Sequence, residues 1–415
     1  MISKRFAILA LLVVIAIETV AQNDSILVSG RDTVAYRYAP IDISPAQPRR
    51  KSKSERRFAR FVIESSIDRS FEKRVDMTFV PAIYYTPSTS AGLAVMAAGL
   101  YRLDKTNRNI PASNFSIYAT ASLTGFYRVG VEGTNIFKND NQRILYSAEF
   151  FSQPTSFWGV GYDAAMANEP MRYLASRCIV DVRFLQRVAK GLYVGVGADY
   201  DYHFGRFGGH RYSSEEDFLP LLGGERVKYS AAGISLYVEF DSRNAISNPQ
   251  KGLYVALQVK SRPKGLNNIG HTLWGGSLVV DYYQRLWRGA VLALDLRGEL
   301  NSKGTPWVYN ATIGGANSMR GYYAGRFNDL CAINLQAELR QNIVKGFGAA
   351  VWGGAGNLFS TFHNFDWGKT VPTYGLGLRY ELKKGVRFRL DYGFGCRDHR
   401  GRLIHGAVFS INEAF

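Results

Sequence analysis

The sequence predicts an all-β protein, a transmembrane antiparallel β-barrel of about sixteen strands. Three observations support this prediction: apolar and polar residues alternate over many runs, the polar positions carry charges of both signs, and glycine and aromatic residues are abundant. The 415 residues include 42 Gly, 25 Tyr and 25 Phe but only 13 Pro, which is typical of twisted strands joined by tight turns. Because such strands alternate between two faces, their mean hydropathy stays near that of a soluble protein.

The alternation begins near Arg74 and continues to the end of the chain. In the run 115–124, apolar residues occupy every second position, and Ser, Thr or Tyr occupy the positions between them. Successive side chains of a strand point to opposite faces, so this period of two predicts strands with one apolar and one polar face. The same pattern recurs in the runs 192–203, 253–260, 330–340, 374–382 and 386–392.

A soluble β-sandwich also alternates, and two features favour a membrane barrel over it. Runs of about ten residues suit a tilted membrane crossing better than the roughly five or six residues of a typical soluble strand. The polar faces interleave Arg with Asp and Glu, which suits a water-filled interior. An even number of strands between Arg74 and Phe415 allows a closed barrel with no unpaired edge in lipid.

The first residues have the three parts of a secretory signal peptide. Lys4 and Arg5 precede an apolar run at 6–17, and a small-residue site at 19–21 follows it. An uncleaved anchor is disfavoured because the apolar core is short, and no later run reaches the roughly 18 apolar residues of a spanning helix. We therefore expect cleavage after Ala21 and export to the outer membrane of a Gram-negative bacterium. The expected parts are a signal peptide at 1–21, a short polar and basic segment at 22–73 and the barrel at 74–415.

The segment before the barrel carries much of the positive charge. The run RRKSKSERRFAR at 49–60 holds seven basic residues and one acidic residue, which is +6 of the chain's formal +17. The run is either an anchor to anionic lipid or another acidic surface, or a solvated helix or linker. The apolar residues between Phe58 and Ile67 are spaced loosely as on a helix, so a short amphipathic helix is expected there. Nucleic acid is not expected as a partner of an exported chain.

The sequence points to no enzyme, no cofactor and no metal centre. Cys178, Cys331 and Cys396 are scattered and odd in number, so we expect single buried or lipid-facing thiols. The six His residues show no metal-ligand spacing. The segment 368–370 resembles the end of a phosphate loop, but His363 stands where that loop requires Gly. A hydrolase is disfavoured because no local signature places a nucleophile beside an oriented His.

One connection is longer than a hairpin needs, the stretch IGGANSMRGYYAGRFND at 313–329. A connection of this length without apolar periodicity is usually disordered or functional. Its composition favours a function, because three glycines free the backbone for a sharp reversal and two tyrosines offer rings for packing. These residues are Gly314, Gly315, Gly321, Tyr322 and Tyr323. Arg320 places one guanidinium among them.

Four stretches after residue 239 carry a family resemblance as a set. They are FDSRNAISNPQKGLYVALQVK at 240–260, IGGANSMRGYYAGR at 313–326, YGLGLRYELKKGVRFRLDYGFG at 374–395 and FSINEAF at 409–415. Together they resemble the BamA/TamA-like superfamily of outer-membrane barrels, also called bacterial surface antigens. PAIYYTPSTSAGLAV at 81–95 resembles the first hairpin of that family. The resemblance implies that the loop at 313–329 is extracellular and folds back into the barrel lumen.

Two departures from the family pattern bear on function. Family members generally carry periplasmic polypeptide-transport-associated domains before the barrel, and the segment 22–73 cannot hold even one comfortably. The strand AAVWGGAGNLF at 349–359 has no acid near Gly354, where the family usually has one. Both departures weaken an assignment as an insertase.

The resemblance implies two candidate functions without covalent chemistry. The first is protein insertion, assembly or translocation across the outer membrane, with a seam between the first and last strands that opens for a client. The second is a passive pore or structural barrel plugged by its own loop. Expected partners are outer-membrane lipids, the outer-membrane assembly machinery that inserts the chain itself, and a protein client or periplasmic partner.

The resemblance also implies site residues at the tip of the loop. The lumen loop motif comprises Gly314, Gly315, Arg320, Gly321 and Tyr322. Strand alternation places Glu338 and Asp391 on the lumen face. We expect Arg320 to enter the lumen and pair with Glu338 through a bidentate fork, with Asp391 as the second acceptor.

The last strand is expected to carry an assembly signal. Alternation puts Phe409, Ile411 and Phe415 on one lipid-facing side, and the resemblance implies that the assembly machinery reads this end. Glu413 would interrupt that side close to the membrane interface, where a carboxylate costs little.

Overall fold

The computed structural model describes residues 70–415, apart from 87–89, 107–109, 111, 223–224, 246–247, 345, 384–385 and 412. The predicted signal peptide at 1–21 and the basic run at 49–60 lie outside the described residues. In the part of the chain that is described, no helix has both the length and the apolar composition to cross a membrane.

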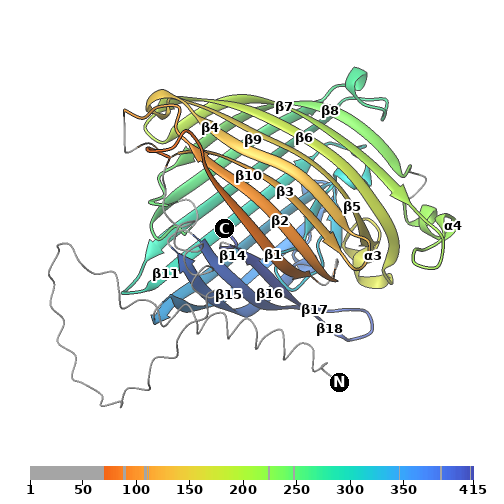
Figure 1. Ribbon diagram of the computed structural model, residues 1–415. Helices are drawn as coiled ribbons and strands as arrows, with labels where there is room; N and C mark the ends of the chain where they lie inside the picture. The colour runs from red at the N-terminus through yellow and green to blue at the C-terminus, as the bar shows by residue number, and fades with distance from the viewer. Residues whose placement is uncertain are drawn as a thin grey trace, which may run out of the picture. The chain divides into compact units, whose positions relative to one another are not determined.

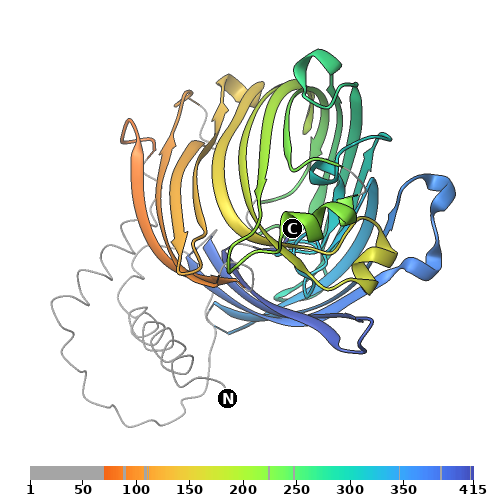
Figure 2. The ribbon, with the colours of Figure 1, turned by 90° about the vertical axis from the view of Figure 1, so that its right-hand side faces the viewer.

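Sixteen strands of the described chain form one antiparallel sheet, which confirms the predicted fold. The strand order follows the sequence from β1 to β18, except that β12 and β13 pair with each other in a small second sheet. The large sheet curves around a common interior (Figures 1 and 2). Its strands are β1 (Asp76–Thr86), β2 (Ser90–Tyr101), β3 (Ser113–Ser122), β4 (Tyr127–Ile136), β5 (Gln142–Phe157), β6 (Met171–Ala189), β7 (Leu192–Arg206), β8 (Lys228–Asp241), β9 (Gly252–Arg262), β10 (Leu273–Arg285), β11 (Ala290–Asn301), β14 (Cys331–Val344), β15 (Phe347–Phe359), β16 (Val371–Lys383), β17 (Val386–Arg397) and β18 (Leu403–Ile411).

The three longest connections, 158–170, 207–227 and 302–330, lie at one end of the barrel, which we term the loop end. The helices α3 and α4 mark this end in Figure 1. The opposite end, which holds the turns at 190–191 and 286–289, is termed the turn end. The remaining elements are β12 (Ala311–Ile313), β13 (Phe327–Asp329), α3 (Tyr162–Ala167), α4 (Glu215–Phe218), η1 (Lys138–Asp140), η2 (Leu219–Leu222), η3 (Lys264–Leu266), η4 (Trp307–Tyr309), η5 (Phe362–Asn364) and η6 (Trp367–Lys369).

The strands carry apolar side chains outside and polar side chains inside. In β14, Ile333 and Leu335 are 40% and 55% exposed, whereas Gln336 and Glu338 are fully buried. The strand period of two produces this arrangement, because alternate side chains face opposite sides of the sheet. The outer surface is therefore an apolar belt of the kind that a barrel presents to lipid.

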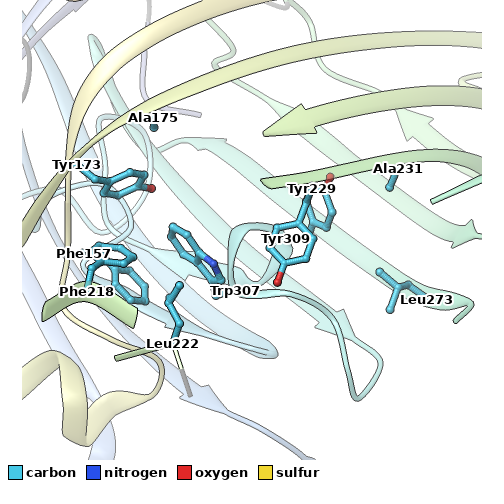
Figure 3. Packing of buried hydrophobic residues seen from close by; sticks show 10 residues of the cluster. All are labelled: Phe157, Tyr173, Ala175, Phe218, Leu222, Tyr229, Ala231, Leu273, Trp307 and Tyr309. Atoms are coloured by element: carbon cyan, nitrogen blue, oxygen red, sulfur yellow. The ribbon is translucent and has the colours of Figure 1, made fainter. Parts of the chain in front are cut away.

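The connection between β11 and β14, residues 302–330, runs through the interior. Its first part brings Trp307 among aromatic side chains of the loop end, with ring centroids 4.7 Å from Phe157 and 5.6 Å from Tyr173. Phe218 of α4 joins the same cluster, so two long connections meet there (Figure 3). The cluster therefore packs part of the loop end with aromatic side chains.

The interior along β14 to β17 is packed, and the expectation of a water-filled interior is wrong for this wall. Arg320, Arg379 and Arg389 are among the largest fully buried side chains of the described chain. The reason is that the loop fills the space in front of the charged strand faces and replaces water as their partner.

Candidate functional site

We call the connection at 302–330 the inner loop. Its tip forms a buried ion-pair cluster with two strands. Arg320 Nη2 lies 2.6 Å from Glu338 Oε2 of β14, and Arg320 Nη1 donates to Asp391 Oδ2 of β17 at 2.7 Å. All three side chains are 0–1% exposed. The guanidinium thus contacts both carboxylates expected as its acceptors, but it places one nitrogen on each of them and makes no bidentate fork on Glu338. The difference arises because β14 and β17 each offer one carboxylate to the same cavity.

Two further groups fix the position of Arg320. Its guanidinium carbon lies 3.8 Å from the ring centroid of Trp352, an inward side chain of β15, in a cation–π contact. The hydroxyl of Thr373 in β16 donates to the backbone carbonyl of Arg320. Every strand from β14 to β17 therefore contributes a contact to this one residue.

The loop follows the inner face of β14 in register. Ser318 Oγ lies 2.8 Å from Asn334 Oδ1, and Met319 N donates to Gln336 Oε1 at 3.0 Å. The Arg320 ion pair with Glu338 continues the series, so three successive loop residues contact three successive inward residues. Met319 has a φ of 49°, a strained left-handed conformation for a residue with a side chain. Alternation had predicted these inward positions of β14, although not their use by the loop.

Close backbone contact requires glycine at the loop tip and on β17. Gly321 has a φ of 107°, and a Cβ on it would lie 2.7 Å from the carbonyl carbon of Gly393. A Cβ on Gly393 would lie 2.5 Å from the carbonyl oxygen of Arg320, and one on Gly395 would meet the Tyr322 ring at 2.3 Å. The inward glycines of β17 thus form a groove for the tip. Sequence reasoning did not assign them this role.

Tyr322 ties the tip to β16 and β17. Its hydroxyl donates to the carbonyl of Pro372 and accepts from the Cys396 backbone N–H at 2.8 Å. Burial raises the pKa of the Tyr322 phenol above its ordinary value, so the hydroxyl keeps its proton. Gly314 and Gly315, with φ values of 110° and 135°, turn the chain just after β12.

Three arginines that the sequence analysis did not single out complete the cluster. Arg379 Nη1 lies 2.5 Å from Asp391 Oδ1, and Arg340 Nε lies 2.7 Å from Glu338 Oε1. Arg389 contacts Asp391 at 3.1 Å and donates to the loop carbonyl of Ala316 at 2.9 Å. Their inward positions, in alternation with the apolar residues of β14, β16 and β17, were the available signal.

The end of the chain turns into the lumen, and the expected lipid-facing position of Glu413 and Phe415 is wrong. Glu413 lies 2.8 Å from both Arg379 and Arg387, and its side chain is 2% exposed. Arg340 Nη2 donates to the Phe415 carbonyl at 2.8 Å. The alternation used for the expectation stops where β18 ends, at Ile411, and the excess of buried arginines attracts the carboxylate of the tail.

The other two residues of the expected assembly signal lie within β18. Phe409 is 40% exposed and stacks on Phe388 of β17 at 6.0 Å, on the outer face of the barrel. The backbone of Ile411 pairs with that of Phe388 at the last position of the ladder.

This arrangement restrains a segment of the chain through ion pairs. The cluster consists of guanidinium and carboxylate groups that already serve as partners for one another. Among the described residues, no group of three or more His, Cys, Asp or Glu side chains is placed to hold a metal ion.

Comparisons with solved structures agree with this fold. Similar structures include BamA from Haemophilus ducreyi lacking POTRA domains 1–3, with 12% identity and a TM-score of 0.54 over 82% of this chain and 70% of that one. CdiB from Acinetobacter baumannii has 13% identity and a TM-score of 0.51. CdiB from Escherichia coli has 10% identity and a TM-score of 0.54. The match covers 82% of this chain but only 60% and 63% of these two CdiB chains.

No curated protein matches the chain in sequence. The Omp85 superfamily domain, however, matches residues 115–415, which run from β3 to the last residue. Barrels of this family lie in outer membranes and generally act in transport or assembly without catalysis. The domain match covers most of the chain and includes both the loop at 302–330 and the strands β14 to β17 that it contacts, so the chain belongs to the Omp85 superfamily.

Proposed function

We propose that this chain inserts, assembles or translocates proteins at the outer membrane, and that its moving part is the seam between β1 and β18. One observation carries the proposal. Among the described residues, β1 and β18 touch each other and stand at the two ends of the hydrogen-bonded strand order, with no ladder between them. The backbone hydrogen bonds between two paired strands add about 1 kcal/mol of net stability each. The junction between β1 and β18 therefore opens more readily than the junctions between paired strands.

Opening at the seam would expose two strand edges to a client. An unpaired edge presents a row of N–H and C=O groups that pairs with an added strand. The client would therefore be a polypeptide in extended conformation.

The Arg320 cluster supports this function by keeping the adjacent wall rigid. It connects the inner loop to β14 and β17, and β17 pairs with β18. Movement at the seam would then leave the loop in place, so that the lumen stays closed while the wall opens.

A sealed structural barrel or passive pore is the second candidate. Its support is the packed interior, where the loop tip and the chain end belong to one buried network of charged side chains. In this alternative the seam stays shut and the loop acts as a plug.

Photo-crosslinking in native membranes distinguishes the two. A photoreactive residue would replace Phe79 of β1 or Phe409 of β18, which are 58% and 40% exposed and flank the seam. Leu236 of β8, 63% exposed and remote from the seam in strand order, is the matched control. Protein adducts from the two seam positions and none from Leu236 would support the proposal. Equal labelling at all three positions, or none at the seam, would contradict it.

A further inference from the structure

The connection between β15 and β16, residues 360–370, folds over the outer wall of the barrel. Outward residues of β15 include Phe347 and Val351, which are 40% and 47% exposed. Further along the same face, Asn357 and Phe359 are only 3% and 4% exposed. Since these positions should face lipid, some other part of the chain must cover them.

The connection itself provides that cover. Asn357 Nδ2 donates to the carbonyl of Asp366 at 2.7 Å and to Thr370 Oγ1 at 3.0 Å. The Phe359 ring lies 5.3 Å from Phe362 and 5.4 Å from Phe365. Figure 2 shows this blue segment projecting away from the ring of strands. We call residues 360–370 the aromatic flap.

The flap presents large aromatic rings to its surroundings. Phe362 is 71% exposed and Trp367 is 80% exposed, and the Trp367 ring packs edge-on against Phe365 at 4.9 Å. Some backbone groups of the short helices η5 and η6 are paired within the flap, with Phe365 N bonded to Phe362 O and Thr370 N bonded to Trp367 O. Each backbone group that is paired internally lowers the cost of placing the flap in an apolar layer.

The flap also contacts a neighbouring segment of the loop end. Lys369 Nζ lies 2.6 Å from Asp163 Oδ2 of α3, which connects the flap to the neighbouring loop-end segment. Below it, the outward residues Tyr374 and Leu376 of β16 are 50% and 64% exposed and continue the apolar belt. The exposed rings therefore adjoin the surface that faces lipid.

We propose that the aromatic flap is a membrane-interface anchor, with Trp367 and Phe362 inserted into the headgroup layer at the loop end of the barrel. Three observations commit it to a lipid surface: it is rooted on lipid-facing positions of β15, it continues the apolar belt, and it combines Trp and Phe with a Lys. Trp rings favour the membrane interface because they join an apolar body to a polar N–H. The anchor holds β15 and β16 at a fixed depth beside the inner-loop cluster.

Fluorescence of the full chain, reconstituted in lipid bilayers that contain no other protein, tests the proposal. The emission of Trp367 is obtained as the difference between the wild type and Trp367→Phe. We expect lipids brominated on the acyl chain near the glycerol to quench most of this emission, and we expect acrylamide in the water to quench little of it. Phe362→Trp in the Trp367→Phe background gives a second reporter on the flap. Heat-modifiable migration establishes that each variant is folded.

The control is His210→Trp in the Trp367→Phe background, at an exposed position in the connection between β7 and β8. This reporter should respond to acrylamide and not to the brominated lipid. If Trp367 instead behaves as the control does, the flap stands in water and the proposal fails. The proposal also fails if Trp367 is shielded from acrylamide in native membranes but not in bilayers that contain no other protein. In that case another protein, and not lipid, covers the flap.

Discussion

The guanidinium of Arg320 and the carboxylate of Glu338 lie 2.6 Å apart, and neither side chain is exposed to solvent. One comes from the tip of a long loop and the other from the inner face of β14. Removing one partner of a buried pair typically costs about 3–5 kcal/mol, because the other charge stays buried without compensation. An exposed pair contributes only about 0–1 kcal/mol. This contact is therefore expected to determine whether the loop stays in the lumen.

Replacing Arg320 with Lys should be nearly as damaging as replacing it with Ala. Two guanidinium nitrogens reach one carboxylate on β14 and another on β17, and a single ammonium cannot reproduce that planar fork. We expect Arg320→Lys to lose most of the protease resistance of the loop at 302–330. Limited proteolysis of the folded barrel in detergent measures this loss. Wild-type resistance in the Lys variant would mean that charge alone holds the loop.

A methyl group on Gly393 should displace the loop tip. Its Cβ would lie 2.5 Å from the carbonyl oxygen of Arg320, a distance that real Cβ contacts do not reach. The matched control is Gly298→Ala in β11, where a Cβ meets nothing within 4 Å. We expect faster proteolysis of the loop in Gly393→Ala and an unchanged rate in Gly298→Ala. Equal rates in the two variants would argue against close contact between the loop and β17.

Neutralising Glu413 should destabilise the barrel through the end of the chain. Glu413→Gln leaves Arg379 and Arg387 without one of their carboxylate partners, in a site where the Glu413 side chain is 2% exposed. We expect a loss of roughly 3 kcal/mol in the free energy of unfolding. Glu381→Gln, which affects a 30% exposed partner of Arg387, should cost about 0–1 kcal/mol. Denaturant titration of both variants compares them, and equal losses would contradict the account.

Deleting Phe415 should lower the yield of folded barrel in cells. The terminal residue is the expected recognition residue of the assembly signal, and its carbonyl also accepts a hydrogen bond from Arg340. The abundance of the heat-modifiable form in outer membranes measures the effect. Purified protein refolded in detergent separates the two roles, because lost recognition lowers only the cellular yield. An unchanged abundance in cells would count against both the recognition role and the stabilising role of Phe415.

The strands and their inward faces could be predicted because a period of two leaves a direct trace in the sequence. That period placed Glu338 and Asp391 in the lumen. It could not place Glu413 and Phe415, since the rule ends with the strand at Ile411 and tertiary charge pairing then decides the path. The use of Gly393 by the loop was also hidden, because a glycine that admits a neighbouring backbone looks like any other glycine in a sequence.

The aromatic flap shows the same limit in another form. Alternation assigns Phe359 to the lipid-facing side, and the structure buries it beneath Phe362 and Phe365. A loop that folds outward over its own strand leaves no periodic signal. Its direction follows from ring packing and the Asn357 hydrogen bonds, which depend on the folded structure.

A double-mutant cycle on Arg320 and Glu338 tests most directly whether this ion pair holds the loop at 302–330 in the lumen. The free energy of unfolding is measured for the wild type, Arg320→Ala, Glu338→Ala and the double variant, with a parallel cycle of Arg320→Ala and Glu381→Ala as control. We predict a coupling energy of about 1–3 kcal/mol in the first cycle and near-additivity in the control. Additive effects within about 0.5 kcal/mol in the first cycle would mean that the two side chains do not interact. The conclusion that Arg320 and Glu338 hold the loop in the lumen would then be wrong.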